Sequence, residues 1–250
     1  MKFPLHLYRI FCMKNTIIYY RDLGLMPYDE AFELQTALFE SIKQIKIDNK
    51  YRDKKVVTDN YFLFTGHPHV YTLGKSGKEE HLLIDERQRR EKSVQFIKTN
   101  RGGDITYHGP GQIVGYPIID LDNFDLDILA YMRLLEEIII DLLDIYGLKG
   151  ERSEGETGVW LDVGKPQARK ICAMGVKTSR WVTMHGFALN VDTDLSYFEH
   201  IIPCGIRNKG VTSLQKELGY TPDKNELKQH IINLFAEKLG ACLLPEKIVG

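Results

Sequence analysis

Apolar residues recur at helical spacing in three parts of the chain. Residues 28–45 place apolar side chains three and four positions apart behind an acidic first turn, which predicts a helix. Residues 127–146 show the same spacing and are followed by Gly147, which suits a C-terminal cap. A third helix is predicted over residues 221–240, with Thr221 as its N-cap and Gly240 as its stop. We expect each helix to bury one face.

Short apolar runs between these helices predict strands. Six runs have strand length and are bounded by glycine or charged residues: 61–64, 94–97, 113–119, 159–161, 171–176 and 187–191. The helices are too few to alternate with these strands, as a doubly wound fold requires. No repeat or Pro/Gly/Ser-rich linker divides the sequence, and the most polar stretch, 48–59, suits a surface loop. We therefore predict one α+β domain over residues 1–250, with mixed sheets packed against helices.

Composition narrows the class of protein further. The 250 residues carry 33 Lys and Arg against 34 Asp and Glu, so a net charge of −1 gives no general attraction to nucleic acid or an anionic membrane. No run reaches the roughly 18 apolar residues of a membrane span. Residues 1–14 make a poor signal peptide because Arg9 interrupts the apolar run, and Met13 is an alternative start. The four cysteines lack a CxxC pair, which favours a cytoplasmic protein with free thiols.

The most distinctive segment is rich in glycine. Residues 101–117 hold five glycines and two prolines in seventeen positions, and end in an apolar strand. Paired glycines let backbone N–H groups approach a ligand closely, and Arg101 and His108 add polar side chains. The segment is neither a Walker loop nor GxGxxG. It predicts a pocket for a ligand with a polar head, and the alternative is a glycine-rich hairpin with structural side chains.

Two later strands carry small residues. Lys170 opens one strand, and Ala173, Gly175, Gly186 and Ala188 lie along it and the next strand. Such side chains leave room beside a sheet for something long and apolar. Close packing between strands would explain the same residues, so both interpretations stand at this point.

Cys204 lies in a sharp turn between Pro203 and Gly205. A cysteine nucleophile reacts as its thiolate, so it needs a neighbouring cation or base to lower its pKa. Lys170 is the lysine at the head of an apolar strand in this region. Lone cysteines are commonly small buried hydrophobes, and the residues alone leave that alternative open.

Taken together, these motifs resemble a known family. The chain resembles the lipoate-pathway octanoyltransferases, the octanoyl-acyl-carrier-protein:protein N-octanoyltransferases, over about residues 22–214. The resemblance rests on Arg101-Gly-Gly-Asp-Ile-Thr-Tyr-His108 and Pro203-Cys-Gly-Ile206, with His67-Pro-His-Val-Tyr-Thr-Leu-Gly74, residues 170–175, 180–191 and 210–214 in the family's order. It implies the catalytic-domain fold of biotin/lipoate–protein ligases.

The resemblance also implies a role for individual residues. Cys204 matches the family's acyl-thioester nucleophile, and Lys170 matches the lysine that lowers its pKa and exchanges protons with it. Three segments match substrate-binding residues: Arg101, Gly102, Gly103, Asp104, Ile105, Thr106, Tyr107 and His108; Ala173, Met174 and Gly175; and Gly186, Phe187 and Ala188. Cys172 departs from the alanine common at its position. Two residues from Lys170, it is expected on the same strand face, where a rival role is open.

The implied reaction is a two-step acyl transfer in protein lipoylation. An octanoyl group passes from octanoyl-acyl-carrier protein to Cys204 and then to a lysine of a lipoyl domain, as found in 2-oxoacid dehydrogenase complexes and the glycine cleavage H protein. No cofactor is implied, and ATP is not needed because the thioester is already activated. The alternatives are an ATP-dependent lipoate or biotin ligase, which needs no cysteine, and a non-catalytic lipoyl-domain-binding module, which tolerates loss of Cys204 and Lys170.

Two further features invite a function. His67, His69 and His81 suggest a metal site, but no carboxylate or cysteine stands beside them at ligand spacing, so we expect none. Residues 86–92 contain three arginines, and we expect a solvated surface segment that would also suit an acidic carrier protein.

Overall fold

The computed structural model describes residues 14–202 and 210–245, and its core is a large mixed sheet. Nine strands form this sheet, in the order β12-β1-β2-β6-β10-β9-β8-β7, with β11 paired to β9. β1 is parallel to both β12 and β2, β11 is parallel to β9, and the other pairs are antiparallel. The strands are β1 Ile17–Leu25, β2 Asn60–Gly66, β6 Gln112–Ile118, β7 Glu151–Ser153, β8 Glu156–Leu161, β9 Arg169–Ser179, β10 Val182–Asn190, β11 Gly210–Val211 and β12 Cys242–Pro245.

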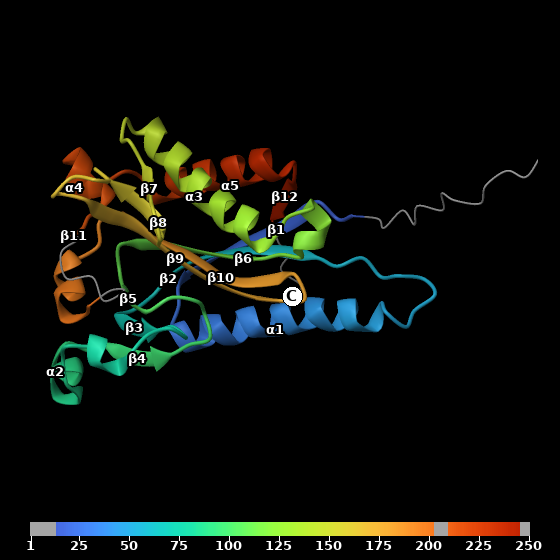
Figure 1. Ribbon diagram of the computed structural model, residues 1–250, viewed down its shortest axis with the longest axis horizontal. Helices are drawn as coiled ribbons and strands as arrows, with labels where there is room; N and C mark the ends of the chain where they lie inside the picture. Colours follow the sequence, from blue (N-terminus) through green and yellow to red (C-terminus); the bar gives the residue numbers. More distant parts are fainter. Residues whose placement is uncertain (1–13, 203–209, 246–250) are drawn as a thin grey trace, which may run out of the picture.

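A second sheet of three strands lies beside the first, in the order β4-β3-β5 (Figure 1). It consists of β3 Val70–Leu73, β4 Gln95–Lys98 and β5 Ile105–His108. Its own apolar cluster includes Tyr71 and Tyr107 of the strands and the half-buried Tyr197 and Phe198 of the 3₁₀ helix η3, Leu195–His200. The small sheet therefore fixes the position of η3, which lies a few residues before Cys204 in the sequence.

Three long helices cover the two faces of the large sheet. Helix α1, Tyr28–Asp48, packs on one face, and α3, Ile128–Ile145, and α5, Lys224–Leu239, pack together on the other (Figure 1). The shorter elements are η1 Glu79–His81, α2 Glu86–Glu91, η2 Leu121–Phe124 and α4 Leu214–Leu218. Each face has its own apolar core, one beneath α3 and α5 and one beneath α1. Within the described residues, no helix is both long and apolar enough to cross a membrane.

The predicted helices and strands are confirmed, with shifted ends. The third helix begins later than predicted, because Asp223 and not Thr221 is its N-cap: the Asp223 carboxylate accepts hydrogen bonds from the N–H groups of Asn225 and Glu226. Gly240 ends it in a left-handed conformation, as predicted. Residues 49–59 form the predicted loop between α1 and β2.

Several short elements lack a periodic signal. Helix α2 has no buried residue, and a capping box between Asp85 and Gln88 begins it instead. β5 lies inside the glycine-rich segment, outside the six predicted strands, and pairs in full with β3. These elements depend on caps and on strand partners distant in the sequence, so local apolar spacing does not reveal them.

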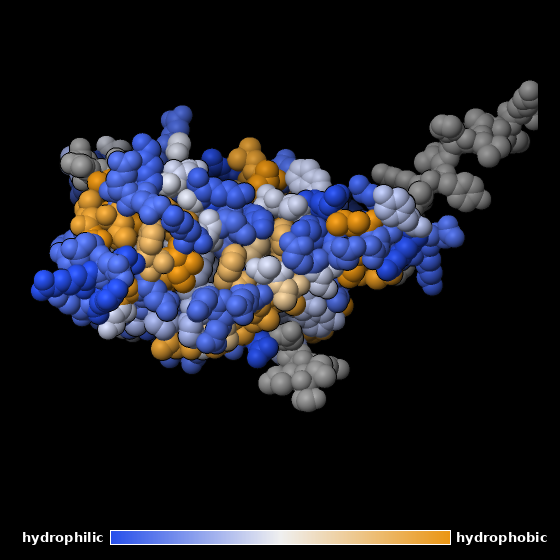
Figure 2. Space-filling model, turned by 90° about the horizontal axis from the view of Figure 1, so that it is seen from below, coloured by the Kyte–Doolittle hydropathy of each residue, from blue (hydrophilic) through white to orange (hydrophobic). Residues whose placement is uncertain are grey.

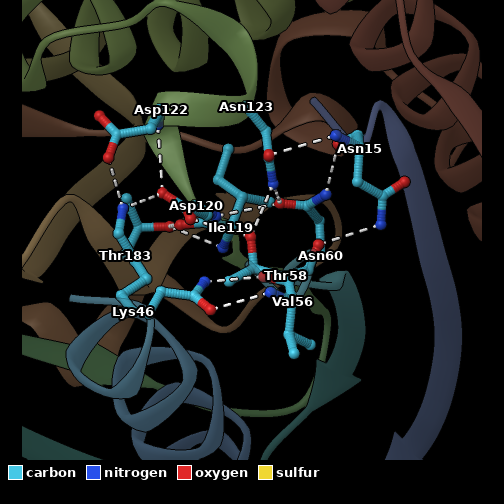
Figure 3. A network of polar contacts seen from close by, with 11 residues as sticks. Asn15, Lys46, Val56, Thr58, Asn60, Ile119, Asp120, Asp122, Asn123 and Thr183 are labelled. Carbon is cyan, nitrogen blue, oxygen red and sulfur yellow. Dashed lines mark hydrogen bonds and ion pairs between the residues drawn. The ribbon is translucent and has the colours of Figure 1, made fainter. Parts of the chain in front are cut away.

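A buried polar network joins α1, β2 and β6 near the C-terminal end of α1 (Figure 3). Asp120, 4% exposed at the end of β6, forms an ion pair with Lys46 of α1 and accepts a hydrogen bond of 2.9 Å from the Thr58 hydroxyl. Its backbone N–H donates to Asn60 Oδ1 at 3.0 Å, and Asn123 donates to both Thr58 and Asn60. The network therefore fixes α1, β2 and β6 to one another at the end of the sheet where α1 stops.

Candidate active site

The three segments predicted to bind substrate meet in one pocket of about 450 Å³. Of the predicted residues within the described ranges, all but Tyr107 line it: Arg101, Gly102, Gly103, Asp104, Ile105, Thr106, His108, Lys170, Ala173, Met174, Gly175, Gly186, Phe187 and Ala188. Tyr107 is fully buried in the small-sheet cluster instead, and its hydroxyl lies 2.7 Å from His69 Nδ1. Cys204 lies outside the described residues.

The small residues of β9 and β10 pair with one another on these two neighbouring strands. Ala173 pairs with Ala188, and Gly175 pairs with Gly186. A Cβ at Gly175 would lie 2.9 Å from the carbonyl oxygen of Gly102, and one at Gly186 would clash with that of Gly115. All four residues line the pocket, and at the two glycines close backbone packing also excludes a side chain. The two interpretations of the small-residue pattern are therefore compatible.

The glycine-rich loop is fastened to the edge of β9. β8 pairs with β9 from Arg169 to Cys172, and beyond that point the Gly102 N–H donates to the carbonyl of Val176 at 2.9 Å. Arg101 is 7% exposed, and its Nη2 donates to the carbonyl and hydroxyl oxygens of Thr72. The guanidinium thus holds the loop against β3. Because the Gly102 N–H is already bonded, it is a poor donor for a reaction oxyanion.

A β-bulge turns Lys170 toward the pocket. The β8–β9 pairing shifts register here, with Val159 opposite Cys172 and Trp160 opposite Lys170. As a result, Ile171 and Cys172 both pack into the core beneath α3 and α5, while Lys170 and Ala173 line the pocket. The Lys170 ammonium lies 4.6 Å from the centroid of the Trp160 ring. A two-residue spacing places Cys172 on the Lys170 face only in a regular strand, so that prediction is wrong.

The position of Cys172 disfavours a role as nucleophile. Its side chain is fully buried, and burial raises the pKa of its thiol well above the usual range, although the charge of Lys170 opposes the shift. A thiol that stays protonated in the core is a poor nucleophile.

The chain is anchored on each side of the Cys204 segment, residues 203–209. Before it, Leu82 and Ile201 form an antiparallel bridge, and the Ile202 N–H donates to the carbonyl of His81 at 2.8 Å. After it, Val211 of β11 pairs with Lys170, and the Thr212 N–H donates to the Lys170 carbonyl at 3.0 Å. The first anchor rests on the segment that precedes α2, and the second on β9.

An ion pair strengthens the second anchor. Arg169 forms two parallel hydrogen bonds with Glu217 of α4, of 2.7 and 2.5 Å. These bonds hold the pKa of Glu217 below its usual value and raise that of Arg169. α4 and β11 are thereby fastened to the head of β9, next to Lys170.

The histidines considered as metal ligands have other partners. His67 contacts the Met26 carbonyl and the Tyr116 hydroxyl, each at 2.8 Å, and burial lowers its pKa to about 4. His69 contacts Tyr107, and His81 Nδ1 lies 2.6 Å from Asp104 Oδ2. In residues 14–202 and 210–245 no group of three His, Cys, Asp or Glu side chains could hold a metal ion.

Two other histidines and two amides line the pocket itself. His108 and His185 are buried there, and burial lowers the pKa of both imidazoles, that of His185 to about 3. Both are therefore neutral at physiological pH. Gln112 and Asn190 also line the pocket, and sequence reasoning did not single them out. The sequence holds a signal for both, because Gln112 precedes the apolar run 113–119 and Asn190 is the one polar residue of the run 187–191.

The arginines of residues 86–92 are largely compensated. In α2, Arg87 pairs with Glu91 and Arg90 with Glu86, while the Arg89 guanidinium lies 5.5 Å from the Phe96 ring centroid. At the end of the molecule that carries α2, a cluster of hydrophilic side chains lies beside an apolar area (Figure 2). The solvated surface is as predicted, but its charge pairing weakens the case for a docking site for an acidic carrier protein.

Known proteins resemble this chain in sequence and in fold. A family model described as the lipoyl protein ligase A/B catalytic domain matches residues 27–236. The chain belongs to this family. An octanoyltransferase from Christiangramia forsetii is 58% identical over 230 residues, covering 92% of this chain and 98% of that protein. One from Flavobacterium johnsoniae is 61% identical over 230 residues, covering 90% and 99%. The predicted resemblance to octanoyltransferases, and with it the acyltransferase class, is confirmed.

Solved structures agree on the fold. A bi-partite lipoate protein ligase from Thermoplasma acidophilum superposes with a TM-score of 0.64 at 17% identity, covering 94% of this chain and 87% of that one. A lipoate-protein ligase A bound with ATP gives a TM-score of 0.64 at 16% identity, covering 94% and 89%. At this identity the likeness shows the fold alone, and it confirms the predicted α+β ligase-like architecture.

Proposed function

We propose that this protein transfers an octanoyl group from octanoyl-acyl-carrier protein to a lysine of lipoyl domains through a thioester on Cys204. The relatives, named octanoyltransferases, support the acyl group. The observation that carries the cysteine route is the pairing of Val211 with Lys170, because it brings the chain that follows Cys204 to the proposed base. Phe198, a few residues before Cys204, lines the same pocket as Lys170.

The first step loads the enzyme. The Lys170 ammonium favours the Cys204 thiolate, which attacks the carbonyl carbon of the octanoyl thioester. A new C–S bond forms to Cys204, and the bond to the phosphopantetheine sulfur breaks. Lys170 gives its proton to that departing thiolate and becomes neutral. The alkyl chain enters the pocket beside Ala173 and Ala188.

The second step transfers the acyl group. The amine of the lipoyl-domain lysine attacks the thioester carbon, an N–C bond forms, and the C–S bond breaks to return the Cys204 thiolate. The surplus proton on the nitrogen passes to Lys170, which is again an ammonium ion. The acceptors we propose are the lipoyl domains of 2-oxoacid dehydrogenase complexes and the glycine cleavage H protein. A reducing cytoplasm would keep Cys204 a free thiol.

An ATP-dependent ligase is the second candidate, because proteins of this fold include one bound with ATP. A ligase activates its acid as an adenylate and has no use for a nucleophilic cysteine. The sequence Pro203-Cys204-Gly205 therefore favours direct transfer.

Intact-protein mass spectrometry tests the proposal. Wild type, Cys204→Ser and Lys170→Met are incubated briefly with octanoyl-acyl-carrier protein, without ATP. We expect an octanoyl adduct on the wild type that hydroxylamine removes, none on Cys204→Ser, and much slower loading of Lys170→Met. An unloaded wild type whose transfer requires ATP would refute the proposal and favour the ligase.

A further inference from the structure

The ring of Trp160 lies against the side chain of the proposed base. Trp160 is 4% exposed and lines the pocket, whereas its neighbours Val159 and Leu161 pack into the core beneath α3 and α5. The Lys170 ammonium stands over this ring, 4.6 Å from the centroid. The electron-rich face of an indole attracts a cation at this distance. Trp160 is therefore an aromatic partner of Lys170.

The register of the two strands sets this contact. Val159 pairs with Cys172, and the same register continued along β8 would place Leu161 opposite Lys170. The bulge shifts the pairing by one residue, so Trp160 stands opposite Lys170 instead. Residues directly opposite each other in an antiparallel pair project to the same face, with Cβ atoms about 5 Å apart. The bulge that turns Lys170 toward the pocket therefore also places the ring beside it.

The stem of Lys170 passes Gly158 on its way to the ring. A Cβ at Gly158 would lie 3.6 Å from Lys170 Cδ, so the methylene groups run close to the backbone of β8. Gly158 has a φ of +116°, and its Cβ would lie 2.5 Å from the Cys172 carbonyl oxygen, which excludes a side chain there. A lysine side chain is long and flexible, and contacts along the stem and at the ammonium reduce the conformations that it samples.

We propose that Trp160 is a positioning residue for the reaction, because its ring holds the Lys170 side chain beside β8 and favours the ammonium form. The inference rests on the proposed function, in which Lys170 is the base. It extends that function to a residue that exchanges no proton and forms no bond with the acyl group.

A ring suits this task better than a carboxylate. In the proposed reaction Lys170 favours a thiolate as a cation, gives up a proton in the first step and regains one in the second. A carboxylate at the position of Trp160 would add a negative charge that repels the thiolate and would bind the proton that Lys170 must give up. The indole face attracts the ammonium, but it carries no net charge and is not a base.

Several charged and titratable groups surround Lys170 in the described chain. They are Glu156 of β8, Arg169 and Cys172 of β9, Glu136 of α3, Glu217 of α4, Arg101 and His108 of the glycine-rich loop, and His185 of β10. Glu136 forms ion pairs with an arginine of α3 and one of β7, and Glu217 forms one with Arg169. A substitution of Trp160 leaves all of these groups in place, so a changed pH dependence reports the loss of the ring.

Fluorescence measures the contact without the reaction. The chain has two tryptophans, so Trp181→Phe leaves Trp160 as the only one, and Cys204→Ser removes the proposed thiolate. In this double variant we expect the emission of Trp160 to change between pH 7 and pH 11, as the ammonium beside it loses its proton. Adding Lys170→Met should abolish that transition. Tyrosine ionisation is common to both proteins and cancels in the comparison. Identical titration curves with and without Lys170 would overturn the inference.

The pH dependence of loading measures the effect on the reaction. Loading from octanoyl-acyl-carrier protein is followed by mass spectrometry, and its rate should fall at high pH as Lys170 loses its proton. For Trp160→Leu we expect this fall to begin about one pH unit lower, the strength of a buried cation–π contact, so that loading on the alkaline side slows about tenfold. Trp160→Phe keeps an aromatic face and should recover part of the shift.

Trp181 provides a matched control. It is 47% exposed in the turn between β9 and β10 and is not among the described residues that line the pocket. Trp181→Leu removes the same atoms as Trp160→Leu and should leave the pH dependence of loading unchanged.

Two kinetic results would overturn the inference: an unshifted alkaline fall in Trp160→Leu, or equal slowing of Trp160→Leu and Trp160→Phe at every pH, which would show a purely structural role. If Trp160→Leu does not fold, the fluorescence titration decides, because it retains Trp160. A wild type that never carries octanoyl on Cys204 would instead refute the proposed function, and the fluorescence result would be unaffected.

Discussion

Ala173 offers a way to test where the acyl chain ends. Lys170 and Ala173 line the same pocket, and three residues of strand separate their backbones by about 10 Å. An eight-carbon chain has seven bonds and is about 8 Å long when extended, at the ~3.5 Å per three bonds of an extended backbone. A chain whose carbonyl lies near Lys170 therefore brings its last carbons to Ala173. Ala173→Leu places three extra carbons in that space.

The expected loss follows from the displaced methylenes. If three carbons of the octanoyl chain lose their apolar contacts, at about 0.8 kcal/mol each, the transition state loses about 2.4 kcal/mol. That corresponds to a fall of about 60-fold in kcat/KM. A hexanoyl chain is two carbons shorter and loses one such contact, or about fourfold. The octanoyl-to-hexanoyl ratio of kcat/KM should therefore fall about 15-fold.

A competition assay measures this ratio directly. Octanoyl- and hexanoyl-carrier protein are supplied together, and the acyl groups on a lipoyl domain are counted by mass spectrometry. Ala130→Leu, which adds the same carbons at an exposed position of α3, should leave the ratio unchanged. Equal losses for the two chain lengths in Ala173→Leu would show that the acyl chain does not end at Ala173.

Two further predictions concern stability. Burial lowers the pKa of His67 to about 4 in the folded protein. Between pH ~6.5 and pH ~4, the unfolded chain therefore binds a proton at this histidine and the folded chain does not. The free energy of unfolding falls as the pH drops through this range. His67→Gln should reduce the loss of unfolding free energy between pH 7 and pH 5 by about 2 kcal/mol in urea titrations, and an unchanged pH dependence would contradict this. Gly186→Ala should cost about 1–3 kcal/mol because its Cβ clashes with the Gly115 carbonyl. Gly66→Ala serves as its control, because a Cβ at Gly66 would lie 3.7 Å from its nearest neighbouring atom. Equal shifts in the melting temperature of the two variants would refute the argument.

The sequence alone predicts the elements that bury a periodic apolar face. The three long helices and six of the strands follow from spacing, because α1, α3, α5 and the central strands of the large sheet each face a core. The glycine-rich loop, Lys170 and the alanine pair are also predicted, and the structure brings them into one pocket. Residues 203–209, with Cys204, lie outside the described chain, so the nucleophile remains a prediction from the sequence.

The parts that escape prediction depend on long-range partners. The bulge that places Lys170 and Cys172 on different faces arises from the pairing of β9 with β8. The alternation of side chains along β9 alone does not reveal it. Likewise, the orientation of the Gln112 amide is set by two acceptors supplied by residues 5 and 78 positions away. Tyr107 belongs to a family motif but serves the core of the small sheet. Motif membership therefore identifies the region of the site better than it identifies the contacts.

The two anchors of the Cys204 segment belong to different bodies of the fold. The Ile202 N–H donates a hydrogen bond to the His81 carbonyl, next to the small-sheet cluster, while Val211 belongs to the large sheet. In the proposed reaction, the distance between the nucleophile and its base would depend on how the cores of the two sheets pack against each other. Substitutions deep in the small-sheet cluster, such as Val94→Ala, should then alter turnover as well as stability.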